Sequence, residues 1–577
     1  MPSTSSRVPI GTEIPLGEPH ALSVSLPTWT DNLAWASGNE DVIKCMSTGY
    51  PRFFVHRKIL ELADIILKDL HVNGSLAHLF PTAHAAQECV AYMRRYVPSS
   101  DDHSISVGLA HILLDDKTRQ LAGRDSLEVY AVIFRPELKK LGKSYWQHTG
   151  TGVSSRYASA CLANIANRVV RPIITSQPWE AQINPCVYAK LHSETQRIAQ
   201  TLQRRIASLA LTGSPPVDQD GISFQVNGRG KVSETDVFLY PSGMSAIWHA
   251  HQLIMKLKPG LKYVSFGFPY TDTVKILEKW GPGCIFYGNH PDDNLIELEA
   301  FLKTTPTPIA ALFCESPSNP LLHSPDLRRL RELADEHGFM IVIDDTIGTF
   351  VNVDVLKYVD IVATSLSKLF SGSANVMGGS VVLNSSCPHY SALKTALESS
   401  YSNDYFLPDL IQMEENSRDF DSRVRKVDVN ARAVCRYLHS HSISYCKDSD
   451  LASGFAIKEV FYPEWVTREN YDLVRRPYRE DNFGHLFSLT FVSLEASEAF
   501  YNTLGCAKGP SLGTNFTLSC PYTLLAHYWE RDWAAGFGIE EGLVRVSVGM
   551  EELDLLMNWF KNAVEAAEGT IGKPPAA

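Results

Sequence analysis

The stretch MIVIDDTIGTFVNVDVLKYVDIVATSLSK (residues 340–368) contains two short apolar runs, MIVID and VDIVATS, and each ends in polar residues. Similar runs precede helical patterns elsewhere: DVFLYP before SGMSAIWHAHQLIMKL, KYVSFGF before TDTVKILEKWG, and IAALFC before SPDLRRLRELADEHG. Continuous apolar runs between helices are typical of parallel strands that are buried on both faces. The sequence therefore predicts an α/β domain over residues 236–425, with a mainly parallel sheet flanked by helices.

The rest of the chain divides into three further parts. Residues 1–71 form a Ser/Pro/Gly-rich arm followed by a segment with helical spacing of apolar residues, RKILELADIILKDL. Residues 72–235 read as an inserted, mixed and largely helical region. Residues 426–577 carry strand patterns such as HLFSLTFVS and a final helical pattern, which predicts a smaller α+β domain.

Composition excludes several classes of protein. The 577 residues carry a net charge of −11, which argues against nucleic acid as the main partner because phosphate backbones require clustered Lys and Arg. No apolar run reaches the ~18 residues of a membrane span, and the N-terminus lacks a signal-peptide core. The 11 cysteines are scattered with no C-x-x-C pair, so we expect reduced thiols in a cytoplasmic protein without a metal site.

Residues with side chains suited to catalysis or ligand binding follow the predicted strands. Because ligands of open parallel sheets bind beyond the carboxyl ends of the strands, we expect these residues to meet at one edge. They are Ser242, Gly243, Met244 and Ser245 before a helix, Tyr270, Glu315, Asn319, Asp344, Ser365, Ser367 and Lys368. A glycine-containing helix start can hold a phosphate, although each feature alone has an ordinary explanation, such as a helix cap or a surface tyrosine.

Together these residues match the needs of pyridoxal phosphate (PLP). Its phosphate needs an anion cradle, its ring needs an aromatic partner, its pyridinium nitrogen needs a carboxylate, and its aldehyde needs a lysine. The helix start at Gly243, the ring of Tyr270, the carboxylate of Asp344 and the amine of Lys368 supply one group for each need.

Several motifs carry a resemblance to a known family. They are SGMSAI, ESPSNPLL, IDDTIGTFVNVDVL, SLSKLFSGSANVMGGSVVLN, GPSLGTNFTL and LVRVSVGME, with VSLPTW and TGYPRFFVH near the N-terminus. The chain resembles the Cys/Met-metabolism PLP enzymes, and most closely the long fungal form of cystathionine γ-synthase. The resemblance covers most of the chain and implies the PLP-dependent transferase fold type I, with a seven-stranded type of sheet.

The resemblance implies a role for each matching residue. Lys368 forms the Schiff base and later moves protons, Asp344 pairs with the pyridinium nitrogen, and Tyr270 stacks on the ring. The implied cofactor-binding set is Gly243, Met244, Tyr270, Asn319, Asp344, Thr346, Ser365, Ser367, Lys368, Tyr50 and Arg52. The implied substrate-binding set is Asn319, Ser511 and Arg545, in which a guanidinium fork suits an α-carboxylate. Tyr270 and Tyr50 are implied as helpers of Lys368 in acid–base catalysis.

The segment GYPR suggests shared active sites. In the family a Tyr-x-Arg motif reaches the neighbouring subunit, so Tyr50 and Arg52 imply a homodimer or homotetramer with active sites shared between subunits. A surface turn around Pro51 is the ordinary alternative, and Tyr188 with Lys190 is a second candidate pair. In the inserted region, TGVSSR (residues 151–156) either shapes the mouth of the site or caps a helix.

The expected reaction is γ-replacement on an O-activated homoserine, such as O-acetyl-L-homoserine, through a vinylglycine ketimine. Cysteine as the nucleophile would give cystathionine. SLSK and SGSAN depart from the SLTK and SGDSN of the housekeeping form, which favours as the alternative a secondary-metabolism paralogue that adds a carbon nucleophile, such as a β-keto acid. A cystathionine lyase and an inactive homologue are weaker alternatives. The sequence also has DDT where the family has DNT, so Asp345 replaces an Asn, and it has YTDT, which begins at Tyr270, where the family has Y-G-G-T.

Overall fold

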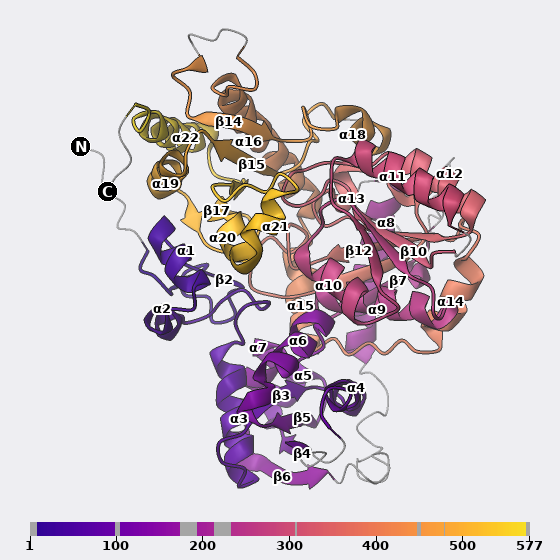
Figure 1. The fold of residues 1–577 in the computed structure, drawn as a ribbon. Helices are drawn as coiled ribbons and strands as arrows, with labels where there is room; N and C mark the ends of the chain where they lie inside the picture. Colours follow the sequence, from indigo (N-terminus) through magenta and orange to yellow (C-terminus); the bar gives the residue numbers. More distant parts are fainter. Residues whose placement is uncertain are drawn as a thin grey trace.

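The computed structural model describes residues 8–98, 104–173, 193–212, 232–305, 308–446, 452–477 and 479–572. Within these ranges the chain forms an N-terminal arm, an inserted α/β unit, a central α/β domain and a C-terminal domain (Figure 1). The candidate pair Tyr188 and Lys190 lies outside the described residues. No helix in these ranges combines the length and apolarity needed to cross a membrane.

The central domain contains a seven-stranded sheet, which confirms the predicted fold class. Its strands, in spatial order, are β7 (Val237–Tyr240), β13 (Gly379–Leu383), β12 (Ile361–Ser365), β11 (Met340–Asp344), β10 (Ala311–Glu315), β8 (Tyr263–Phe266) and β9 (Cys284–Tyr287). Only β13 runs antiparallel to its neighbours β12 and β7. Glu315 pairs with Asp344 in the β10–β11 register, so both carboxylates end their strands at the same edge of the sheet.

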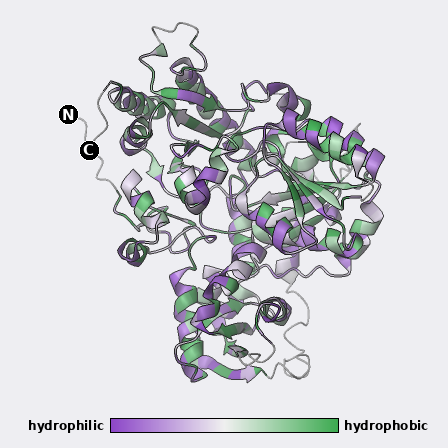
Figure 2. Ribbon diagram, viewed as in Figure 1, coloured by the Kyte–Doolittle hydropathy of each residue, from purple (hydrophilic) through white to green (hydrophobic). Residues whose placement is uncertain are grey.

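Helices cover both faces of this sheet. They are α8 (Ser193–Thr212), α9 (Gly243–Leu257), α10 (Thr271–Lys279), α11 (Pro291–Thr304), α12 (Leu327–His337), α13 (Thr349–Asn352), α14 (Tyr390–Glu398) and α15 (Leu407–Asn416). Figure 2 shows the strands as mainly hydrophobic between helices that carry hydrophilic residues. This pattern explains why the strands appear in the sequence as continuous apolar runs, since neither face of the sheet meets water.

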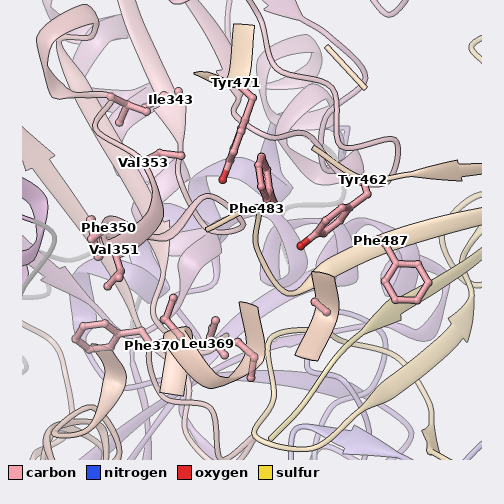
Figure 3. Close-up of a cluster of buried hydrophobic side chains, with 14 of the residues drawn as sticks. Ile343, Phe350, Val351, Val353, Leu369, Phe370, Tyr462, Tyr471, Phe483 and Phe487 are labelled. Atoms are coloured by element: carbon pink, nitrogen blue, oxygen red, sulfur yellow. The ribbon is translucent and has the colours of Figure 1, made fainter. Parts of the chain in front are cut away.

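A buried cluster joins the central domain to the C-terminal domain (Figure 3). It combines Ile343 of β11 and the pair Leu369 and Phe370 with aromatic residues of the C-terminal domain, including Tyr462 and Phe487. Leu369 and Phe370 directly follow Lys368 in the chain. Their burial therefore holds the backbone of Lys368 in place, because side chains in a close-packed core have little freedom to move.

The C-terminal domain is α+β. Its five-stranded sheet has the order β14 (Ile457–Phe461), β15 (Leu486–Phe491), β18 (Val544–Ser547), β17 (Leu518–Pro521) and β16 (Ala507–Lys508). Its helices are α16 (Phe420–Ser440), α18 (Arg468–Val474), α19 (Leu494–Thr503), α20 (Tyr522–His527), α21 (Arg531–Ala535) and α22 (Leu553–Glu568). The boundary that the sequence predicts between residues 425 and 426 falls inside α16, so this helix passes between the two domains.

The N-terminal arm packs against the C-terminal domain. It contains β1 (Glu13–Ile14), β2 (Ser23–Val24), α1 (Trp29–Ala36) and α2 (Glu40–Cys45). The Leu26 amide donates to the Lys508 carbonyl at 2.9 Å, and the Ser23 hydroxyl donates to the Pro510 carbonyl at 2.6 Å. These bonds bring the following segment, which includes Tyr50, toward the central domain.

The inserted unit contains a sheet that the sequence analysis did not anticipate. Its strands, in the order β3 (Leu76–Phe80), β5 (Ser126–Phe134), β4 (Ile105–Leu113) and β6 (Arg168–Ile173), are all antiparallel. Its helices are α3 (Arg57–Asp69), α4 (Ala83–Arg94), α5 (Asp116–Ala122), α6 (Lys139–Thr149) and α7 (Ser155–Ala163). The prediction of a largely helical region missed these strands because β5 is buried along almost its whole length and lacks the alternation of a half-exposed strand.

Candidate active site

One cavity of about 190 Å³ lies at the carboxyl edge of the central sheet. Its lining comes from the arm, the inserted unit, the central domain and the C-terminal domain. The structure brings together every residue of the implied cofactor-binding and substrate-binding sets: Tyr50, Arg52, Gly243, Met244, Tyr270, Asn319, Asp344, Thr346, Ser365, Ser367, Lys368, Ser511 and Arg545. Their individual roles stay predictions.

Lys368 presents its amine inside this cavity. The Nζ atom donates to the Tyr50 hydroxyl at 3.1 Å and to the Ser511 Oγ at 2.9 Å, and it lies 4.3 Å from the centre of the Tyr50 ring. The lysine side chain is only 7% exposed, so these two oxygens stand in for the water that an ammonium group would otherwise bind.

Lys368 lowers the pKa of Tyr50. Burial by itself would raise the pKa of Tyr50, but the charge and hydrogen bond of Lys368 hold that pKa below its usual value. A phenol with a lowered pKa next to an amine can exchange a proton with it. Tyr270 behaves differently, because burial raises its pKa well above the ordinary value.

An anion cradle begins at the first turn of α9. The Ser242 hydroxyl caps this helix by accepting a hydrogen bond from the Ser245 amide at 3.1 Å. Gly243 is required here because a Cβ atom at this position would lie 2.6 Å from the Ser365 Cβ. The first turn of α9 therefore lies directly against Ser365 at the end of β12, and a helix N-terminus beside a hydroxyl suits a phosphate.

Asp344 is held by the residues around it. The Thr346 amide donates to its Oδ1 at 2.9 Å, and the Thr346 hydroxyl in turn accepts from the Ser365 amide at 2.8 Å. Burial raises the pKa of Asp344, while the bonds from Thr346 and the charge of Lys368 oppose that shift. Asp345, the departure from the family triplet, is buried and does not line the cavity.

Glu315, which the sequence places at the end of a strand, is absent from the implied cofactor-binding and substrate-binding sets. Its carboxylate accepts hydrogen bonds from the Tyr270 amide at 2.6 Å and from the Asn319 amide at 2.8 Å. Burial, followed by the nearby charge of Asp344, raises the pKa of Glu315 to about 8. Its place at a strand end was visible in the sequence, but its two backbone partners were not.

Arg545 forms a fork beside the lysine. Its Nη1 donates to the Asn319 Oδ1 and its Nη2 donates to the Ser511 carbonyl, both at 2.8 Å. The guanidinium lies 4.9 Å from the ring centre of Tyr522, a lining residue that sequence reasoning missed. Ser511 has a φ of +104°, a conformation that a serine rarely adopts and that is concentrated at functional sites.

The structure contains a single chain, so the expectation that Tyr50 and Arg52 reach a neighbouring subunit stays a prediction. Both residues lie in the cavity of their own chain, because the arm runs back over its own C-terminal domain. Arg52 forms a buried ion pair with Asp272, the residue that departs from the family's Y-G-G-T. Gln147 of the inserted unit also donates to Asp272, at 3.2 Å. Three parts of the chain therefore meet at this aspartate.

The SGSAN segment does not touch the cavity. None of the residues from Ser371 to Asn375, all within the described part of the chain, lines it. Instead the Ala374 carbonyl accepts from the Leu22 amide at 2.7 Å, and the Asn375 amide group donates to Glu18 at 3.2 Å. The segment thus anchors the arm, so its missing acid says little about the nucleophile.

The donor set fits pyridoxal phosphate. A cradle that a Cβ atom would fill, at Gly243, faces two serines, while a buried carboxylate and a buried amine lie beside it. These are the groups that the phosphate, the pyridinium nitrogen and the aldehyde of PLP require. Gly243, Met244, Ser365, Ser367 and Arg52 would hold the phosphate.

Comparisons with known proteins define the class. Residues 232–565 match the family model of the Cys/Met metabolism PLP-dependent enzymes, and residues 58–154 match that of the N-terminal domain of fungal trans-sulfuration enzymes. The chain therefore belongs to the Cys/Met metabolism PLP-dependent enzyme family, and its cofactor is PLP.

Relatives and solved structures agree with this class. The chain is 40% identical to the cystathionine gamma-synthase-like enzyme iboG2 of Amanita muscaria, in an alignment of 627 residues that covers 98% of each chain. It is 38% identical over 628 residues to the cystathionine gamma-synthase of Neurospora crassa, covering 97% of this chain and 98% of the relative. Cystathionine gamma-lyase from yeast shares the fold, with a TM-score of 0.51 and 20% identity over 68% of this chain and 91% of that chain.

Proposed function

We propose that this enzyme catalyses γ-replacement on an O-activated homoserine, of the O-acetyl-L-homoserine type, with cysteine as the nucleophile and cystathionine as the product. The observation that carries the proposal is the position of the Lys368 amine, within hydrogen-bond distance of Tyr50 and Ser511. The Arg545 fork lies on the other side of Ser511. The full-length similarity to the Neurospora crassa enzyme supports the choice of reaction.

Each residue has a task in this reaction. Arg545 and Asn319 bind the α-carboxylate of the amino acid and so fix the position of its Cα. The Lys368 amine takes the proton from Cα and then one from Cβ. The bond from Cγ to the activated oxygen breaks, and acetate leaves with the bonding electron pair. The cysteine thiol gives up its proton as its sulfur bonds to Cγ, and the protons return to Cβ and Cα. PLP, when bound, supplies the electron sink for the charge that develops at Cα.

Tyr50 supports the proton transfers. Its hydroxyl is 3.1 Å from the Lys368 Nζ, and its lowered pKa lets it accept a proton from the amine and return it. The buried surroundings keep water away from the amine, which strengthens the attraction between these charges. Asp344 would hold the pyridinium nitrogen in its protonated form.

A second candidate nucleophile has one observation in its favour. The arm and the inserted unit line the cavity with apolar side chains: Leu22, Phe53, Phe54, Ile59, Trp146 and Val153. Cysteine carries both an ammonium and a carboxylate group, and each needs a polar partner when buried. A β-keto acid such as acetoacetate carries one charged group. A carbon nucleophile would therefore suit this lining, as in a secondary-metabolism paralogue.

Two experiments test the proposal. Borohydride reduction of the enzyme loaded with PLP should attach the cofactor to the peptide that contains Lys368, and a peptide without this mass would contradict the assigned amine. Incubation with O-acetyl-L-homoserine and either cysteine or acetoacetate, followed by mass spectrometry, then separates the two nucleophiles. Cystathionine as the only product would remove the second candidate.

The family resemblance supports an oligomeric enzyme. We propose a homodimer or homotetramer, in which each site is complete within one chain because the chain's own arm supplies Tyr50 and Arg52. The scattered cysteines of the sequence support a cytoplasmic location.

A further inference from the structure

The loop between α6 and α7 of the inserted unit reaches the phosphate cradle. The Ser242 hydroxyl, which caps α9, donates to the Gly150 carbonyl at 3.0 Å. Gly150 ends α6 with a φ of +61°, and a Cβ atom at this position would lie 2.2 Å from the Ser242 Oγ and 2.9 Å from the Ser245 amide nitrogen. No larger residue fits here without moving the first turn of α9.

The loop and the start of α7 are held on two sides. On the side of the inserted unit, the Val153 amide donates to the Leu79 carbonyl of β3 at 3.0 Å. On the side of the central domain, the Arg156 Nη1 lies 3.3 Å from the Asp409 carboxylate in an ion pair with little exposure. The same guanidinium donates to the carbonyl of Asn375, which lies in the segment after Lys368. The loop thus transmits the position of the inserted unit to the cradle.

The hydrogen bond to Gly150 also sets the orientation of the Ser242 hydroxyl. Because its hydrogen points to the Gly150 carbonyl, a lone pair of Oγ is left to accept from the Ser245 amide. Without the carbonyl the hydroxyl could rotate and release the cap. The free N–H groups of the first turn, which face the anion, would then lose their fixed direction.

We propose that the inserted unit is a structural part of the PLP phosphate site, with Gly150 as the positioning residue that fixes Ser242 and the first turn of α9. The inference rests on the proposed use of PLP and extends it to a residue outside the central domain. The sequence TGVSSR then has both of its expected roles, since Gly152, Val153 and Ser155 line the cavity and Ser154 caps α7.

The test compares Gly150→Ala with Gly74→Ala. Gly74 lies in the same unit with a φ of +78°, and a Cβ atom there would meet nothing within 4 Å, so its variant carries the backbone strain without the collision. The affinity of each apoprotein for PLP and for pyridoxal, which lacks the phosphate, is measured by absorbance titration. We expect Gly150→Ala to weaken PLP binding about ten-fold or more, the effect of losing one charge-assisted hydrogen bond. Pyridoxal binding should change little, and Gly74→Ala should change neither affinity.

A second measurement needs no variant and covers the case in which Gly150→Ala does not fold. Inorganic phosphate added to the wild-type apoprotein should slow hydrogen exchange in residues 150–155 as well as in residues 242–245. Equal PLP affinities for the two glycine variants, or protection confined to residues 242–245, would overturn the inference. Failure of the wild-type protein to bind PLP at all would instead refute the proposed function.

Discussion

Replacing Glu315 by glutamine should loosen two parts of the site at once. The carboxylate accepts from the amides of Tyr270 and Asn319. A glutamine keeps one acceptor oxygen, and its NH₂ group faces the second amide as another donor. One buried backbone N–H group is then left without a partner, which costs about 1–3 kcal/mol in the free energy of unfolding.

The pH dependence of this loss has a definite sign. The pKa of Glu315 is raised to about 8 by burial and by Asp344, so the folded apoprotein binds more protons than the unfolded chain above the ordinary carboxyl pKa. Wild-type stability should therefore fall as the pH rises toward about 8, while E315Q does not titrate at this position. The difference in the free energy of unfolding between wild type and E315Q should be largest at acidic pH and should shrink as the pH approaches about 8.

Denaturant unfolding of the apoproteins across this pH range measures the effect. A control for the substrate effect is Asp360→Asn, because Asp360 is also buried, accepts from the Ile341 amide at 2.7 Å and from Arg331 at 2.8 Å, and lies at the opposite edge of the same sheet. In addition, E315Q should raise the KM for the amino-acid substrate about ten-fold, because Glu315 holds Asn319 and Asn319 bonds to Arg545. Asp360→Asn should leave this KM unchanged. A stability loss that is independent of pH, with an unchanged KM, would refute the network described for Glu315.

Three further results are expected. Gly243→Ala should abolish tight PLP binding, since its Cβ atom would collide with Ser365, and retention of wild-type affinity in an absorbance titration would contradict the cradle. Ultraviolet difference titration of the apoprotein should show a phenol that ionises below the usual tyrosine pKa. Lys368→Ala should raise the pKa of this phenol, because Lys368 holds the pKa of Tyr50 down against the effect of burial. Co-expression of Tyr50→Phe with Lys368→Ala should restore no activity, because each site is built within one chain; recovery would show that the arms exchange between subunits.

The sequence predicted the residues at the carboxyl edge of the sheet because parallel strands place their ends together. Asp344 and Lys368 could be assigned in this way without any contact being known. The residues that were missed depend on contacts between distant segments. Gly150 meets Ser242, and Asp272 meets Arg52, across separations of 92 and 220 positions in the chain. A local pattern carries no signal for such contacts.

The inserted sheet was missed for a different reason. Its long strands are covered by helices on both faces, so their apolar residues follow no period of two. The choice between its own chain and a neighbouring subunit as the site that the arm completes also lay beyond the sequence, since a motif that resembles a family's shared-site residues does not say which copy it serves.

The cavity has a consequence for how the enzyme is made. Its lining runs from Ala21 near one end of the chain to Arg545 near the other. During synthesis the arm and the cradle therefore leave the ribosome long before the strand that carries Arg545, and the substrate fork can form only when nearly the whole chain is available. Folding must close contacts across this entire length, and contacts between distant segments form more slowly than local ones. The pocket is therefore complete only after Arg545 has been synthesised, and a chain that ends before this residue would lack the Arg545 fork.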